Sequence, residues 1–265
     1  MHTLQRILFF IFLPILSGYA DIEDPNEWMM NYYRAPDPAS MPEMILTLAE
    51  SGKLAEAKEQ APLVGFASQV MSANSDQIPE WMEIWGQLPE ESLSPVITAL
   101  WFSNTAEAKE YFAANGLDEY LEADAPNILG MHPDSPGTIN LLWGYFFATG
   151  TKAPIESLVT TLSLAKYSGA LAAYQDSEKS EEDRKAAYLD ATFQAALLTL
   201  ERYSASHPRV LRYCEEIIDS GNLTERENLW LRVAIARAKS PPEEILMEET
   251  SSESVDTEPS DSPED

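Results

Sequence analysis

The sequence predicts an all-α fold of about ten to twelve helices, and three observations support this prediction. Apolar residues recur at three- and four-residue spacing in most segments, whereas no run shows the alternation typical of a strand. Capping residues, or a small residue before proline, begin these segments, and Gly or Asn ends many of them. Most segments are also close to the ordinary helix length. The predicted arrangement is stacked antiparallel helix hairpins, either tetratricopeptide-like or an irregular α-solenoid or bundle.

Residues 1–20 have the pattern of a cleavable signal peptide. Met1 to Arg6 form a short, positively charged segment, and Ile7 to Leu16 form an apolar one. Small residues then precede a cleavage position after Ala20. An uncleaved membrane anchor is the alternative, but the apolar run is too short to cross about 30 Å of hydrocarbon. The residue directly after that position is Asp21 rather than cysteine, which argues against a lipoprotein anchor. We therefore expect an exported protein, periplasmic or secreted, with no later membrane span.

A single helical domain is expected over residues 21–240. In its first half, helix starts and stops are predicted at Pro25 to about Arg34, Ser40 to Gly52, Ala61-Pro62 to Asn74, Pro79 onward, Ser94-Pro95 onward, and Thr105 to Asn115-Gly116. A short helix over Leu117 to Ala123 and then a loop are expected next. The small-residue–Pro pairs at Ala61, Ser94, Ser135 and Ala153 also raise the possibility of a helical repeat. Coincidence is the alternative, since such pairs are good helix starts anywhere.

The segment from Ser135 to Gly150 is predicted to be the central helix. Ser135 is a suitable N-cap, Pro136 suits the first turn, and Gly150 can end the helix in the left-handed conformation. Apolar residues occupy two faces, so we expect both faces to be covered. Gly144 inside this helix costs about 1 kcal/mol relative to alanine. We therefore interpret Gly144 as the point where a neighbouring helix comes close.

The second half is predicted to contain four further helices, two of them with capping boxes. These boxes are Ser180 with Asp183 and Thr224 with Glu227. The expected elements run from Ala153-Pro154 to about Tyr167, from Ser180 to about Ser206, from His207-Pro208 to Gly221, and from Thr224 through Val233.

The chain is strongly acidic, with a formal net charge of −27. Residues 241–265 hold ten acidic residues and no Lys or Arg, and this low-hydrophobicity tail is predicted to be disordered. Acidic residues also outnumber basic ones by about two to one in the rest of the mature chain. Such a charge would repel nucleic acid and anionic lipid, so we expect neither as a partner.

No motif predicts a metal or cofactor site. The mature chain has two histidines, His132 and His207, far apart in sequence, and one cysteine, Cys214, on an apolar helix face. We expect His132 in an exposed loop, His207 at a helix cap and Cys214 in the core. There is no Cys-x-x-Cys, calcium loop, glycine-rich phosphate loop or nucleophile elbow. The prediction is therefore no cofactor and no metal.

One enzymatic alternative rests on Glu156. Glu156-Ser157, followed by Ser168-Gly169-Ala170 and Gln175, resembles part of the lytic transglycosylase motif. In that family the glutamate is the general acid that cleaves peptidoglycan. The Gly-Leu-Met-Gln element of the motif is absent here, and the spacing to Gly169 is one residue long. Glu156 also suits the positive end of its own helix, which is a purely structural explanation.

A second resemblance covers more of the chain. It is carried by Trp28 with Tyr32-Tyr33, Pro36-Asp37-Pro38, Pro62-Leu63-Val64-Gly65-Phe66, Ala99-Leu100-Trp101, Leu142 to Gly150, and His207-Pro208-Arg209-Val210-Leu211. These segments resemble an uncharacterised family of exported bacterial all-helical proteins, in which Trp-Gly-x-Phe-Phe-Ala-Thr-Gly is the most specific element. The resemblance implies an exported all-α protein and transfers no site residue.

The expected function is binding or scaffolding outside the cytoplasm, with a protein or cell-envelope component as partner. Aromatic-rich amphipathic helices without a catalytic constellation favour this interpretation. The candidate binding residues are the aromatics Trp28, Tyr32, Tyr33, Trp81 and Trp85, because such side chains dominate binding hot spots. The alternative is that these aromatics belong to the core, as aromatic stripes at helical spacing usually do.

Overall fold

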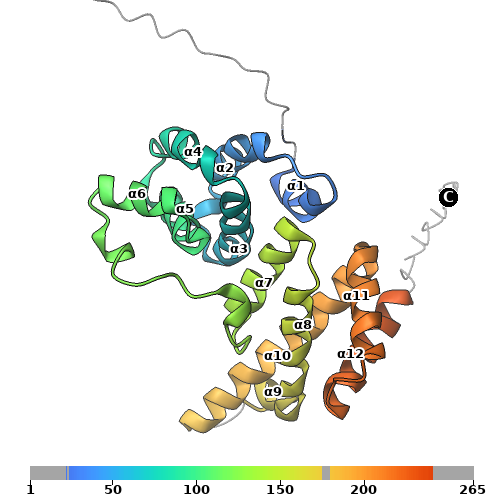
Figure 1. Cartoon of the computed structure of the whole chain (residues 1–265). Coiled ribbons are helices and arrows are strands. Elements are labelled where there is room, and N and C mark those ends of the chain that lie inside the picture. The colour runs from blue at the N-terminus through green and yellow to red at the C-terminus, as the bar shows by residue number, and fades with distance from the viewer. Residues whose placement is uncertain (1–21, 23, 175–179, 241–265) are drawn as a thin grey trace, which may run out of the picture.

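The computed structural model describes residues 22, 24–174 and 180–240. Figure 1 shows an entirely helical chain, and the described residues form twelve α-helices and seven 3-10 helices with no strand. The predicted all-α fold is confirmed. The predicted signal peptide (1–20) and acidic tail (241–265) lie outside the described residues.

The first group of helices comprises α1 to α6. Its elements are α1 (Pro25–Asn31), η1 (Tyr32–Arg34), η2 (Pro38–Ser40), α2 (Met41–Glu50), η3 (Lys53–Ala55), α3 (Ala57–Ala73), η4 (Ser75–Gln77), α4 (Ile78–Trp85), α5 (Glu90–Ser103) and α6 (Ala106–Ala114).

The rest of the chain continues through α7 into a second group. Its elements are η5 (Asp118–Tyr120), η6 (Ile128–Gly130), α7 (Pro136–Thr149), α8 (Ala153–Thr160), η7 (Thr161–Tyr167), α9 (Ala170–Tyr174), α10 (Glu181–Ser206), α11 (Pro208–Asp219) and α12 (Glu225–Lys239). Figure 1 shows α7 between the two groups.

Of the predicted arrangements, the observed helix packing matches an irregular bundle. In the first group α3 packs mainly against α5 and α7, and in the second group α10 packs against α9, α11, α12 and η7. In a regular solenoid each hairpin contacts mainly the next one. Here α3 instead packs most extensively against α7, with three α-helices between them in the sequence, so the core depends on non-local contacts.

The closest helix contact is between α3 and α7. A Cβ on Gly144 would overlap the carbonyl oxygen of Pro62 and stand 2.7 Å from the backbone nitrogen of Phe66. A Cβ on Gly65 would likewise overlap the backbone of Leu141. Only glycine allows the two backbones to approach this closely. The interpretation of Gly144 as a helix-packing position is confirmed.

Both capping predictions for α7 are also confirmed. The Ser135 hydroxyl accepts a hydrogen bond from the Thr138 backbone N–H at 3.1 Å, and Gly150 ends the helix with φ of 61°. Most of the large side chains of α7 are buried, including Trp143, Phe146 and Phe147. Their burial agrees with the prediction that the central helix is covered on two faces.

Two predicted helix starts are wrong. Pro62 and Pro95 are each the sixth residue of a helix, because α3 begins at Ala57 and α5 at Glu90. Proline lacks an N–H, but near the start of a helix only one or two bonds are lost, and packing can offset that loss. Two of the four small-residue–Pro pairs therefore do not mark helix starts, and the repeat hypothesis loses its basis.

Other differences concern short helices. Within the predicted helix Leu117 to Ala123 only the 3-10 turn η5 forms, and the helix predicted to reach Tyr167 changes to the 3-10 helix η7 after Thr160. The sequence did not predict α9. Its cap comes from another helix, since the Leu171 N–H donates to the Asp190 carboxylate of α10 at 2.9 Å. A cap supplied across the fold leaves no local sequence signal.

Replacing Asp190 should destabilise the protein. The Asp190 side chain is fully buried, and its other oxygen accepts from the Gln194 amide at 3.1 Å. We expect Asp190→Ala to lower the free energy of unfolding by about 2–3 kcal/mol, because it leaves the half-buried Leu171 N–H and the Gln194 amide without their shared acceptor. Urea denaturation measures this loss, and Gln194→Ala serves as a control with a loss below about 1 kcal/mol. Equal losses in the two variants would contradict the capping role.

Candidate functional site

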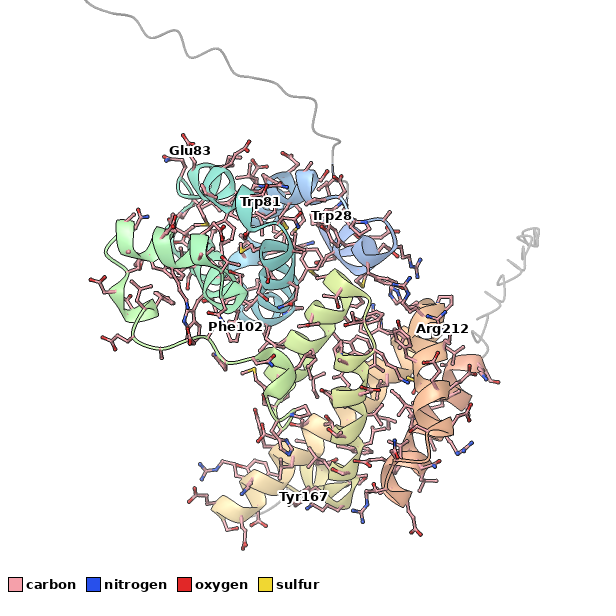
Figure 2. The ribbon with its side chains drawn as sticks, in the orientation of Figure 1. Trp28, Trp81, Glu83, Phe102, Tyr167 and Arg212 are labelled. Carbon is pink, nitrogen blue, oxygen red and sulfur yellow. The ribbon has the colours of Figure 1, made fainter. Side chains whose placement is uncertain are left out.

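Most of the predicted binding aromatics lie in the core. Figure 2 labels Trp28 and Trp81 among the side chains of the first group. Trp81 is buried on α4, with its ring centroid 5.7 Å from that of Trp85. The indole N–H of Trp85 donates to the Pro42 carbonyl at 3.4 Å. Trp85 therefore joins α4 to α2.

The remaining three aromatics lie in two different places. Tyr32 is buried, with edge-to-face contacts to Trp28 and Phe66 at centroid separations of 5.1 Å each. Tyr33 is buried at the other side of η1, against Phe146 and His207. Four of the five candidate binding aromatics are buried, which agrees with the alternative that they belong to the core. The five side chains also do not lie on one surface. A partner-binding role for them stays a prediction.

Tyr33 belongs to a hydrogen-bonded cluster that joins the N-terminal segment of the described chain to the junction of α10 and α11. Its hydroxyl lies 3.1 Å from Nδ1 of His207, and Nε of Arg34 donates to the same hydroxyl at 3.2 Å. The Nη2 atom of Arg34 donates to the Ser206 carbonyl at 3.2 Å and lies 3.2 Å from Nδ1 of His207. Because arginine can only donate, Nδ1 is the acceptor and the ring proton is on Nε2. Tyr33 then accepts from Arg34 and donates to His207.

This cluster keeps His207 neutral. The residue is only 4% exposed. Burial, reinforced by the positive charge of Arg34, lowers the pKa of His207 to about 4. A neutral imidazole is also what the hydrogen-bond pattern requires. His207 stands at the N-cap position of α11 as predicted, but its side chain makes no capping bond because it is engaged with Tyr33 and Arg34.

A second layer of contacts holds Tyr33 in place. The guanidinium of Arg209 lies 4.8 Å from the centroid of the Tyr33 ring, within cation–π range. The Tyr213 hydroxyl donates to the carbonyl of Gly150 at 3.1 Å, and a Cβ on Gly150 would stand 2.9 Å from the Tyr33 ring. Segments from η1, the end of α7 and the start of α11 therefore meet here.

A groove borders this cluster, between α1 and the end of α10. Its volume is about 460 Å³, within the range of small-ligand sites. We call it the α1–α10 groove, and its lining is Asp24, Glu27, Met30, Asn31, Arg34, Arg202, Tyr203, Ser206 and His207. Among the described residues no ion pair joins Arg34 or Arg202 to a carboxylate. A guanidinium without a carboxylate partner is available to an anionic group of a ligand.

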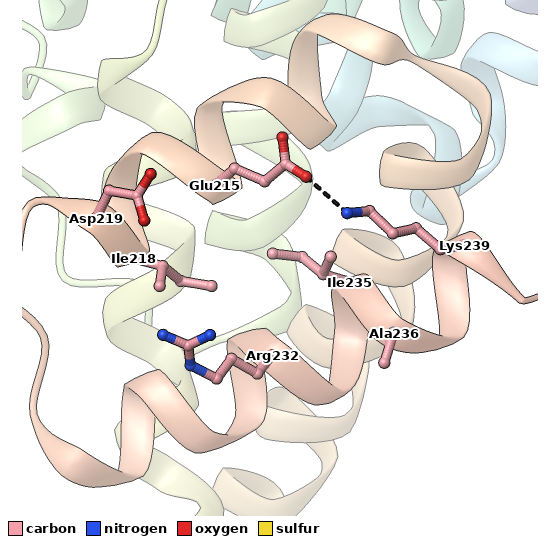
Figure 3. Close-up of a pocket in the computed structure, with 7 residues that line it drawn as sticks. All are labelled: Glu215, Ile218, Asp219, Arg232, Ile235, Ala236 and Lys239. Atoms are coloured by element: carbon pink, nitrogen blue, oxygen red, sulfur yellow. Dashed lines mark hydrogen bonds and ion pairs between the residues drawn. The ribbon is translucent and has the colours of Figure 1, made fainter.

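A second pocket, between α11 and α12, has about 510 Å³ and is shown in Figure 3. Its cations already have partners: Lys239 pairs with Glu215 at 2.7 Å, and Nε of Arg232 donates to Asn228 at 2.6 Å. The charge of Lys239 is compensated by an ion pair, whereas Arg232, like Arg34, has only a neutral hydrogen-bond partner within the described part of the chain. The α1–α10 groove differs in that neither of its two arginines forms an ion pair with a described residue.

Glu156 lies on the surface in the first turn of α8. Its side chain is 56% exposed, and its carboxylate is 3.8 Å from the Nζ atom of Lys152. Lys152 also pairs with Glu216 on α11 at 3.3 Å. A glycosidase acid normally has an apolar environment that keeps it protonated. The exposure of Glu156 agrees with its helix-dipole explanation, while the enzymatic alternative stays a prediction.

Metal ligands and reactive thiols are also relevant to function. No group of three or more His, Cys, Asp or Glu side chains within the described ranges is arranged to hold a metal ion. Cys214 is buried, and burial raises the pKa of its thiol to about 11, so the thiolate is scarce at neutral pH. None of the helices described here has both the length and the apolar character to cross a bilayer.

Tyr33 and His207 were singled out from the sequence, whereas the groove beside their cluster was not. Arg34, Arg202 and Met30 were not singled out, because neither arginine stands in a charged motif and the two are far apart in the sequence. The one available signal was the resemblance, since three of its segments (those with Tyr33, Gly150 and His207) meet at the cluster. In comparisons with protein families, curated protein sequences and solved structures, no match was found, so the family resemblance stays a prediction.

Proposed function

We propose that this protein is an exported helical binding protein and that the α1–α10 groove is where it holds its partner, a protein or cell-envelope component. The pattern of residues 1–20 supports export. The observation that carries the binding role is Arg34, which is held by three neighbours at the edge of the groove and has no carboxylate partner among the described residues.

The groove is pre-organised for binding. Because Tyr33, Ser206 and His207 already fix the guanidinium of Arg34, a ligand would lose little affinity to side-chain ordering. Tyr203 and Met30 add an aromatic and an adaptable apolar surface beside this charge. Arginine and tyrosine are also the residue types that dominate binding hot spots.

Site-specific photo-crosslinking tests the proposal. A benzoylphenylalanine at Asn31, which lines the groove, should capture one defined partner from the cell envelope. The matched control carries the same group at Glu83, an exposed position on α4 that Figure 2 labels. We expect the Asn31 product to disappear when Arg34→Gln is added. Identical products from Asn31 and Glu83, or none from either, would contradict a binding role for the groove.

A further inference from the structure

We infer that the α1–α10 groove recognises a short peptide by its two ends, with the peptide carboxylate at Arg34 and the peptide amino group at Glu27. This inference rests on the proposed function of the same groove and names the ligand chemistry. It follows from the order of charges along one wall and from the length of that wall.

Arg34 is the residue that binds the carboxylate of the peptide. Its Nε and Nη2 atoms are engaged with Tyr33, Ser206 and His207, whereas Nη1 has no hydrogen bond to the described residues. Nη1 can therefore donate to an incoming carboxylate, and a charge-assisted bond of this kind is about twice as strong as a neutral one. Arg202 lines the same groove and adds a second positive charge.

Glu27 is the residue that binds the amino group of the peptide. The other acidic lining residue, Asp24, already caps α1 by accepting from the backbone N–H groups of Asn26 (2.9 Å) and Glu27 (3.3 Å). Glu27 is exposed, and within the described residues its carboxylate has no ion pair, so it is the available partner for an ammonium group.

The spacing of these two ends selects the peptide length. From Glu27 to Arg34 the wall consists of helix α1 and the 3-10 turn η1, which together rise about 10–12 Å. An extended peptide spans at most about 3.3–3.6 Å per residue, so about three residues fit between the two charges. Met30 on this wall and Tyr203 opposite offer apolar surface to the middle residue.

The same charges disfavour a plain anion. Asp24 and Glu27 repel a polyanion, and His207 adds no positive charge because it is neutral. A ligand with one charge of each sign is therefore favoured over inorganic phosphate, which would use the arginines alone.

Calorimetric titration of the mature full-length chain with Ala-Phe-Ala tests the inference. We expect the free tripeptide to bind, and its C-terminal amide and its N-acetyl form to bind at least about 10-fold more weakly, which corresponds to about 1.4 kcal/mol each. Inorganic phosphate is the comparison probe. Equal binding of the free and blocked peptides, no binding of the free peptide, or binding of phosphate alone would overturn the inference.

Two substitutions assign the ends. Glu27→Lys changes an exposed residue outside the buried cluster, so the fold should persist, and the variant should bind the acetylated peptide at least as well as the free one. Arg34→Gln should remove the penalty of amidation, because it removes the positive charge that attracts the carboxylate, while Arg212→Gln, on α11 outside the groove, should bind like wild type. If Asn31 still captures an envelope partner but no tripeptide binds, the peptide inference fails and the proposed function stands. If both fail, the groove has neither role.

Discussion

Gly144→Ala should unfold the protein or bring it close to unfolding. The added Cβ would meet two backbone atoms of α3, the carbonyl oxygen of Pro62 and the nitrogen of Phe66, rather than a side chain that could rotate away. The clash can therefore be relieved only if α3 and α7 move apart, and these two helices form the most extensive helix–helix contact among the described residues. Overpacking against movable side chains costs about 1–3 kcal/mol. With backbone on both sides we expect a loss above about 4 kcal/mol, a large part of the 5–15 kcal/mol typical of a domain.

Gly137→Ala is the matched control for this prediction. Gly137 lies in the first turn of the same helix, and its added Cβ would have Ser135 Oγ as its nearest neighbour, at 3.7 Å. We expect Gly137→Ala to be neutral or to stabilise by up to about 1 kcal/mol, because alanine is the better helix former. Circular dichroism during heating compares the two variants. A Gly144→Ala protein that melts like wild type would show that α3 and α7 are not in close backbone contact.

Features with local sequence signals were predicted well. The caps of α7 and the capping boxes of α10 and α12 were predicted from the residues at the helix ends themselves, and the structure confirms all of them. Gly144 was interpreted correctly because an unfavourable residue inside a strongly apolar helix needs a compensating contact. Local propensity and packing agree at these positions, so the sequence alone was sufficient.

The groove could not be predicted in the same way. Tyr33 and His207 are 174 positions apart, and their contact depends on how α1 and α11 are placed around α7. Periodicity also could not separate a binding aromatic from a core aromatic. Trp81 and Trp85 are buried because α4 has neighbours on its aromatic face, and a single helix does not reveal its neighbours.

The stability of the fold should depend on the protonation of His207. Its pKa is about 4 in the folded protein and 6.5 in its ordinary state. Both states hold a neutral imidazole above pH 6.5, so the contribution of His207 is fully present there. Between pH 6.5 and 4 the unfolded chain binds a proton that the folded chain excludes, and the contribution is lost as the pH falls. The shift corresponds to a loss of up to about 3 kcal/mol.

Comparison with His207→Gln isolates this effect from the many carboxylates that also titrate in acid. The charged groups near the ring are Arg34, and Asp24, Glu27 and Arg202 along the groove, and these remain in both proteins. Tyr33 and Tyr203, which contact the ring, are likewise unchanged in both proteins. We therefore expect the stability advantage of wild type over His207→Gln, measured by urea denaturation, to shrink steadily from pH 7 to 4.5. As a control, the stability difference between wild type and His132→Gln should stay constant over the same range, because His132 is exposed. An advantage of His207 that is constant with pH would mean that the imidazole titrates equally in both states, and the cluster would then not hold it neutral.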